Sequence, residues 1–202
     1  MKITRIELQK NDNTRFSLFS DDQYVMSVSA ENLAPYGYGE FEISEEELEI
    51  LKAKEEEGLF FKQALLYVSK ALKTSKEVRD YLYKKKVSPE LQDEIIEKLL
   101  DLKLLDDERY LEMYLEEKFN YSTDGSIKIK HKLYQKGFQS KDVDPLLPKY
   151  QDLEISNLKK LVSDRKKSRK NEDKQKLIRY LMNKGYEYSM ISEVVKEEEY
   201  YE

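Results

Sequence analysis

The stretch TSKEVRDYLYKKKV, residues 74–87, decides the fold because the chain repeats its pattern twice more. Residues 125–138 and 173–186 align with it without a gap. Four positions keep their character in all three copies: apolar Val78, Ile129 and Leu177; apolar Leu82, Leu133 and Leu181; basic Lys85, Lys136 and Lys184; bulky Val87, Phe138 and Tyr186. A recurrence about every fifty residues is typical of a stacked array in which each unit buries its apolar face against its neighbours. Function is therefore expected on the surface of the array.

Capping signals predict that each copy is the middle helix of a three-helix unit. Thr74 and Glu77 form a capping box at the start of the first middle helix, and Pro89 takes the first position of the helix that follows. Gly137 and Gly185 end the later middle helices, where a glycine in the left-handed conformation commonly caps a helix. Each unit therefore has sharply defined helix boundaries.

Apolar spacing predicts the remaining helices. The helix before the first middle helix has an apolar face made of Phe61, Leu65, Val68 and Leu72. The second unit starts at Asp106, and its last helix is expected from Ser140 to Tyr150. The third unit runs from Leu153 to the tail, with Leu158 and Val162 facing inward.

The first sixty residues have a different pattern. Runs 4–8, 15–19 and 23–28 alternate apolar and polar residues and are separated by turn-forming Asn and Asp residues, which predicts a three-stranded meander. Ser44 and Glu47 form a capping box ahead of Leu48, and Gly58 is expected to end the helix that starts there.

These patterns predict a mainly α protein. It is an elongated tandem array of three-helix, helix-turn-helix-like repeats, preceded by a small N-terminal β-meander and a helix. The expected domains are the meander with its helix at 1–58, repeat 1 at 59–105, repeat 2 at 106–150 and repeat 3 at 151–202.

Composition excludes several function classes. No apolar run approaches the roughly 20 residues of a membrane span, so we expect a cytoplasmic protein without membrane contact. The chain has no cysteine and one histidine, His131, which lies among lysines, so thiolate metal sites and a Ser-His-Asp arrangement lack their parts. We interpret Asp106 as a helix cap rather than a metal ligand. A non-enzyme that uses no cofactor or metal is expected.

Charge is segregated along the chain, although the formal net charge is only −5. Residues 1–61 carry six Lys or Arg and fourteen Asp or Glu, whereas residues 126–141 carry five lysines and no acid. Residues 157–185 carry eleven Lys or Arg and three acids. The acidic whole argues against indiscriminate coating of nucleic acid, but the two basic segments could form a local anion-binding surface.

The basic segments supply the candidate binding residues. Lys128, Lys132 and Lys136 share one face of a helix, and the run 165–170 is expected between helices, where mobile cations could follow a phosphate backbone. An ordinary solvated face and a flexible solubilising linker are the structural alternatives. The candidates are Lys128, Lys130, Lys132, Lys136, Arg165, Lys166, Lys167, Arg169, Lys170 and Arg179.

Three short helices joined by tight turns also resemble a DNA-binding helix-turn-helix unit. The helix of the first unit that would enter a groove carries Glu90, Asp93, Glu94 and Glu97, which would repel phosphate. Direct DNA binding without a protein partner is therefore the alternative hypothesis, and a scaffold for an unrelated acidic partner is a third.

The chain resembles the RecX family of regulatory proteins over essentially its whole length. The resemblance lies in residues 72–78 (LKTSKEV), residues 104–110 (LLDDERY), and Gly125 followed by Ile129, Leu133 and Lys136-Gly137-Phe138. The N-terminal strands with residues 43–48 (ISEEEL) resemble the longer form of the family found in Gram-positive bacteria.

The resemblance implies a monomer that binds along the groove of a RecA filament on single-stranded DNA. It implies that the protein suppresses recombinase and ATPase activity without catalysing a reaction, and that the basic candidates contact the filament or its DNA. Lys73 stands where family members usually carry arginine, and the sequence pI is near 5.3. Both features favour docking to filament protein, with weak binding to single-stranded DNA alone.

Overall fold

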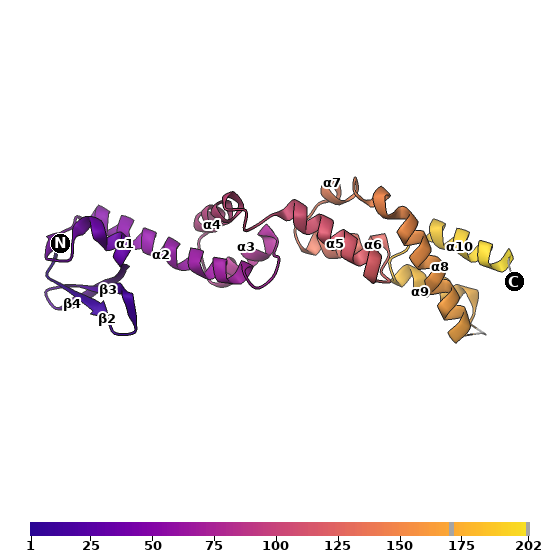
Figure 1. The fold of residues 1–202 in the computed structure, drawn as a ribbon, viewed down its shortest axis with the longest axis horizontal. Coiled ribbons are helices and arrows are strands. Elements are labelled where there is room, and N and C mark those ends of the chain that lie inside the picture. The colour runs from indigo at the N-terminus through magenta and orange to yellow at the C-terminus, as the bar shows by residue number, and fades with distance from the viewer. Residues whose placement is uncertain (170–171, 201–202) are drawn as a thin grey trace. The chain divides into compact units, whose positions relative to one another are not determined.

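The computed structural model describes residues 1–169 and 172–200, with the side chains of 197–200 left out of the description. The chain is mainly helical, and its strands lie within the first 42 residues of the described part (Figure 1). It divides into two compact units, taken in turn below: Met1–Lys70 with Tyr81–Leu99, and Ala71–Asp80 with Leu100–Glu202. The predicted fold class, a small β region followed by three-helix repeats, is confirmed.

The first unit begins with the predicted meander. Three strands pair antiparallel in sequence order, β2 (Arg5–Gln9), β3 (Asp12–Ser20) and β4 (Gln23–Ser29). The turn between β3 and β4 has Asp21 and Asp22 at positive φ, 46° and 64°, as a tight hairpin requires. A second, two-stranded pair was not predicted, β1 (Lys2–Ile3) with β5 (Phe41–Glu42). Two-residue strands are too short for alternation to reveal them.

A long helix follows the sheet in the first unit. Two short turns, α1 (Ala30–Leu33) and η1 (Ala34–Tyr36), lead to α2 (Glu45–Val68). The predicted capping box at the start of α2 is present, with Ser44 and Glu47 each bonded to the other's backbone N–H. The prediction that Gly58 ends this helix is wrong. A glycine inside a helix costs only about 1 kcal/mol relative to alanine, and the strong helix formers on both sides continue the helix through it.

The core of the first unit joins the sheet to α2. Its buried residues are Ile3, Leu18, Met26, Val28, Leu33, Ile43, Leu48 and Leu51. Beside this cluster the buried Glu55 accepts hydrogen bonds from Arg15, Asn32 and both the backbone N–H and hydroxyl of Ser29, at 2.7–2.8 Å. Burial opposes ionisation of Glu55, but these hydrogen bonds outweigh it, and its pKa is lowered. One carboxylate thus ties two strands and α1 to α2.

The predicted apolar face of residues 61–72 is only partly buried. Helix α2 ends at Val68, so Leu72 is not on it, and Leu65 and Leu72 are 36% and 49% exposed. Ala64, which the spacing did not include, is fully buried. The prediction extended the helix past its last turn to Leu72 and missed the buried Ala64.

The helices of the repeats are α3 (Ser75–Lys84), α4 (Pro89–Asp101), α5 (Asp107–Tyr121), α6 (Ser126–Gln135), α7 (Ser140–Val143), α8 (Gln151–Ser168), α9 (Lys174–Asn183) and α10 (Tyr188–Tyr200), with a 3-10 turn η2 (Leu147–Tyr150) before α8. Predicted caps are confirmed. Thr74 and Glu77 exchange backbone bonds of 3.2 and 3.1 Å, and the Asp106 carboxylate accepts the Arg109 N–H at 2.8 Å. Pro89 is the first residue of α4.

Two predicted boundaries in the repeats are wrong. The expected helix from Ser140 to Tyr150 is broken into α7 and η2, because Pro145 and Pro148 lack the N–H that a continuous helix needs. The basic run was expected between helices, but Arg165, Lys166 and Lys167 form the last turn of α8. Lys and Arg are good helix formers, and cations are favourable at a helix C-terminus.

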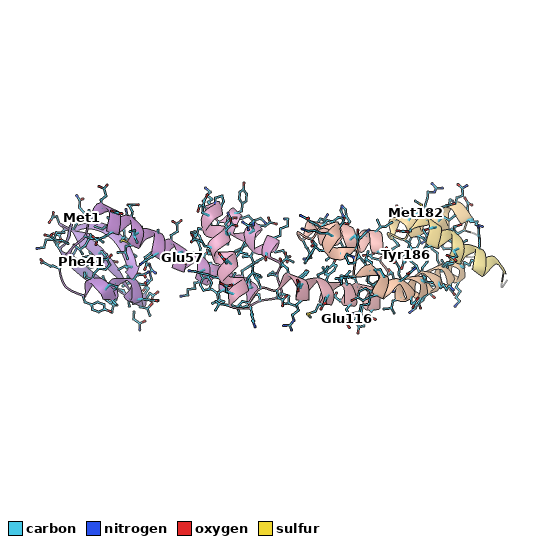
Figure 2. The ribbon with its side chains drawn as sticks, turned by 90° about the horizontal axis from the view of Figure 1, so that it is seen from above. Met1, Phe41, Glu57, Glu116, Met182 and Tyr186 are labelled. Atoms are coloured by element: carbon cyan, nitrogen blue, oxygen red, sulfur yellow. The ribbon has the colours of Figure 1, made fainter. Side chains whose placement is uncertain are left out.

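The shared apolar positions of the three copies are buried as predicted. Val78, Ile129 and Leu177 are at most 6% exposed, and Leu82, Leu133 and Leu181 are fully buried. In the second unit, Ile129 and Leu133 belong to one cluster with Leu111, Leu115, Phe119 and Val143. Leu177 and Leu181 belong to another with Leu158, Val162, Ile191, Val194 and Val195. Tyr186, the bulky residue of the third copy, is 1% exposed and lies among the helices of this unit (Figure 2).

Candidate functional site

The predicted row of lysines on α6 is not a row of free charges. Lys128 Nζ lies 2.8 Å from Asp124 Oδ1, and Lys132 Nζ lies 2.5 Å from Asp124 Oδ2. Burial opposes ionisation of Asp124, but hydrogen bonds from both lysines outweigh it and lower its pKa. The Asp124 side chain, which is 12% exposed, therefore holds two lysines whose side chains are about 40% exposed.

Lys136 is held by a different acid, on another helix of the second unit. Its Nζ lies 2.9 Å from Glu77 Oε1 on α3 and 5.2 Å from the ring centre of Tyr110 on α5. Burial acts to lower the pKa of Lys136, but the hydrogen bonds to Tyr110 and Glu77 act in the opposite direction and outweigh it, so the pKa is raised. Lys136 therefore contacts Glu77 and Tyr110 and does not join Lys128 and Lys132 at Asp124.

The basic segment of repeat 3 contains the most complete charge cluster. Arg165 donates Nε–H and Nη2–H to the two carboxylate oxygens of Glu172, both at 2.7 Å. Its guanidinium carbon lies 3.6 Å from the ring centre of Tyr180, and Arg169 approaches the same carboxylate at 3.6 Å. The bidentate pair lowers the pKa of Glu172 and raises that of Arg165. A planar fork between a carboxylate and a ring is geometry that lysine could not supply.

The remaining candidates lie in varied surroundings. Lys130 Nζ approaches Asp144 at 3.3 Å, and Lys166 also has a partner. Lys167 is exposed, as is Arg179, whose Nε–H donates to the Gln175 carbonyl at 3.4 Å. Lys170 lies outside the described residues. The structure therefore brings Lys128 and Lys132 together, and Arg165 and Arg169, but it does not join all the candidates in one patch.

Sequence reasoning missed the acids that hold these cations. They are Glu77, Asp124, Asp144 and Glu172. The four-residue spacing from Asp124 to Lys128 was a usable signal, because such pairs are neighbours on one helix turn. Arg169 lies only three residues before Glu172, but the remaining pairs are separated by 7 to 59 residues in sequence, so local spacing does not reveal them.

Contact between successive repeats positions these clusters in the second unit. The loop after α9 lies against the start of α6, where the Gly125 and Ile127 N–H groups donate to the Lys184 and Gly185 carbonyls at 2.8 and 3.0 Å. A Cβ atom on Gly125 would lie 2.5 Å from the Gly185 carbonyl carbon. The buried Glu154 carboxylate accepts the neighbouring Ser126 N–H at 2.6 Å.

The loop after α6 makes the corresponding contact one repeat earlier. The Thr74 hydroxyl donates to the Lys136 carbonyl at 2.9 Å, and a Cβ atom on Gly137 would lie 2.7 Å from Lys76 Cβ. In both places the loop that ends one middle helix covers the start of the middle helix before it. At the start of α6 the contact is made by backbone N–H and carbonyl groups, whereas at the start of α3 it is made by the Thr74 side chain.

The described residues contain no group of three or more His, Cys, Asp or Glu side chains arranged to hold a metal ion. None of their helices is long and apolar enough to cross a membrane.

The fold and the charge clusters define a protein of tandem three-helix repeats whose surface cations are held by carboxylates. The chain belongs to the RecX family of regulatory proteins. The family model for the RecX N-terminal domain matches residues 1–37, and those for the first, second and third RecX three-helix domains match residues 61–99, 106–145 and 153–195.

Relatives and solved structures agree with this assignment. The chain is 30% identical to regulatory protein RecX of Listeria innocua, across 97% of this chain and 74% of that protein. It is 32% identical to RecX of Clostridium acetobutylicum, across 96% and 95% of the two chains. A crystal structure of regulatory protein RecX has the same fold, with a TM-score of 0.76, 23% identity and coverage of 96% and 98%. RecX from Lactobacillus salivarius matches with a TM-score of 0.65 at 28% identity, over 71% of this chain and 97% of that one.

Proposed function

We propose that this protein binds the RecA filament on single-stranded DNA and modulates, mainly inhibits, its recombinase and ATPase activities. Membership of a family of regulatory proteins supports a regulatory role. The observation that carries the proposal is the repeated helical unit with fixed contacts between successive copies in residues 71–80 and 100–196. Repeated, similarly built surfaces are suited to a partner that is itself a repeated assembly.

We propose that the chain acts through four parts, 1–58, 59–105, 106–150 and 151–202. Each repeat would add a modest contact, and linking them would raise the effective concentration of the later contacts once the first has formed. Inhibition requires that the bound protein has higher affinity for a filament state that cannot exchange strands or turn over nucleotide, because a ligand shifts an equilibrium only by its differential affinity. The protein would act as a cytoplasmic monomer and catalyse no reaction itself.

The charge clusters support docking to protein with phosphate contacts secondary. Six of the candidate cations, Lys128, Lys130, Lys132, Lys136, Arg165 and Arg169, are held by four carboxylates, which leaves two net positive charges. Affinity for free nucleic acid depends on the number of phosphates neutralised, so weak binding to DNA alone is expected. Among the candidates that the structure describes, Lys167 and Arg179 are exposed and lie outside those ion pairs.

The test is a titration of the protein into RecA-coated single-stranded DNA, with ATP hydrolysis and strand exchange as readouts. The proposal predicts that both rates fall as occupancy rises and level off at saturation. Unchanged rates at saturating occupancy would reject it. A direct DNA-binding protein that needs no recombinase would instead bind naked DNA tightly, with a steep dependence on salt.

A further inference from the structure

The acids of repeats 2 and 3 recur at one position of the repeat. Asp124 and Glu172 occupy equivalent places, each one residue before the N-cap of the middle helix, at Gly125 and Asp173. Both side chains are nearly buried, 12% and 10% exposed, and each contacts two basic side chains. The corresponding residue of the first repeat is Lys73, so the acid is confined to repeats 2 and 3.

The partners differ in sequence position, although the acids correspond. Asp124 holds two lysines that follow it on α6, at positions 128 and 132, whereas Glu172 holds two arginines that precede it, at positions 165 and 169. The same outcome, one carboxylate between two cations, is therefore reached with different side chains. Within the described residues, the hydrogen bonds that the Asp124 carboxylate accepts come from the two lysines. Holding cations is the role that its contacts show.

A carboxylate between two lysines lowers the net positive charge that an anion encounters at the surface. The cluster of Asp124 with Lys128 and Lys132 has one net positive charge instead of two, and the carboxylate is always present at short range. A phosphate must displace it, and an intramolecular group has a high effective concentration compared with a ligand from solution. The two lysine side chains are about 40% exposed, so they are reachable once the carboxylate charge is removed.

We propose that Asp124, and in the same way Glu172, are specificity-determining residues that mask basic side chains and so make free single-stranded nucleic acid a weak ligand. If the proposed function is right, masking makes the protein prefer a protein partner, which supplies further contacts, over bare phosphate; this consequence rests on the proposed function. The masking itself can be measured with this protein and a polyanion alone.

The test compares Asp124→Asn with Asp164→Asn. Asparagine keeps the size of the aspartate and removes its charge, whereas Asp164 is an exposed acid on α8 without an ion pair in the described part of the chain. Both variants change net charge equally. Binding to a fluorescein-labelled oligo-dT is followed by anisotropy over a range of salt concentrations.

Asp124→Asn is expected to bind several-fold more tightly at low salt and to steepen the slope of log K against log salt by about 0.7, the value for one more phosphate contact on a single strand. Asp164→Asn should change the slope by less than half as much. Adding Lys128→Gln and Lys132→Gln to Asp124→Asn should remove the gain. Thermal unfolding of each variant verifies that the fold is intact.

Equal slopes for Asp124→Asn and Asp164→Asn would overturn the proposal, as would failure of Asp124→Asn to gain affinity. Persistence of the gain after both lysines are replaced would also overturn it. The RecA ATPase titration of the unmodified protein separates the two ideas. A gain for Asp124→Asn on oligo-dT, with no effect of the protein on the ATPase, would support masking and reject the filament role.

Discussion

The second residue after the middle helix is Lys86 in the first repeat and Gly185 in the third, and both have positive φ, 64° and 92°. Gly137 occupies the same position in the second repeat with φ of 102°. The backbone conformation alone therefore tolerates a lysine. A Cβ on Gly137 or Gly185 would meet Lys76 or Lys128 of the preceding repeat, at 2.7 and 2.4 Å. Close approach between repeats, rather than helix capping alone, requires glycine.

Gly185→Ala is expected to have the largest effect on stability. The new Cβ would lie 2.4 Å from Lys128 Cβ and 2.6 Å from its backbone nitrogen, so the backbone must move. We expect a loss of about 3–5 kcal/mol in the free energy of unfolding, from overpacking and left-handed strain together. Urea unfolding measures it. Gly58→Ala is the control, because nothing lies within 4 Å of that position in α2 and alanine should stabilise it by about 0.5–1 kcal/mol.

Gly137→Ala tests the second repeat, where the three atoms nearest the new Cβ would be Cβ, Cδ and Cγ of Lys76, at 2.7, 3.2 and 3.4 Å. Rotation of the Lys76 side chain moves its Cγ and Cδ away but leaves its Cβ in place, so a shift is still needed. Because no backbone atom is among the three nearest, we expect a smaller loss, about 2–3 kcal/mol. The same urea experiment gives the value. A loss equal to or larger than that of Gly185→Ala would show that contact with backbone atoms, rather than side-chain atoms, does not decide how much stability is lost.

Lys86→Gly should have the opposite sign. Glycine adopts positive φ without the penalty of a side chain, and Lys86 is exposed, so little contact is lost. The gain is expected at about 0.5–1 kcal/mol, since greater freedom of the unfolded chain offsets part of the relief. A decrease in the urea midpoint would mean that the Lys86 side chain has a structural role.

The smallest expected effect is on the pH dependence of stability, through the ion pair of Glu77 with Lys136. Burial opposes ionisation of Glu77, but hydrogen bonds from Lys136 and the Thr74 N–H outweigh it, so its pKa is lowered in the folded protein. The carboxylate therefore contributes stability above its unfolded-state pKa, and this is lost as pH falls through the folded-state pKa. Glu77→Gln should make the acid-induced loss of unfolding free energy smaller.

Urea unfolding at neutral and acidic pH checks this prediction, with Glu116→Gln as the matched control. Glu116 is exposed on α5, where Figure 2 labels it, and it makes no ion pair within the described residues. An identical pH dependence of Glu77→Gln and the unmodified protein would contradict the stabilising role of the Glu77–Lys136 pair.

Local signals in the sequence predicted much of the fold. The apolar positions of residues 74–87 and their copies gave the buried faces, and Ser44, Thr74, Asp106 and Pro89 gave helix starts, because capping depends on residues within one turn. Boundaries failed where a single residue type was over-interpreted. Gly58 does not end α2, and the basic charges after Asp164 do not end α8.

The candidate site was less predictable for a physical reason. A cation's availability depends on which carboxylate the fold brings to it. Lys136 meets Glu77 across 59 residues, and Lys132 meets Asp124 across eight. The sequence shows where positive charge is concentrated, but these ion pairs depend on contacts that exist only in the folded chain.

The most direct test of the account is an equilibrium comparison of binding to the RecA filament on single-stranded DNA and to the same DNA without RecA. Sedimentation at one salt concentration measures both. We predict saturable binding to the filament that is at least about tenfold tighter than to naked DNA, as linked repeats on a repeated partner allow. Equal affinity for the filament and the naked strand would contradict the account.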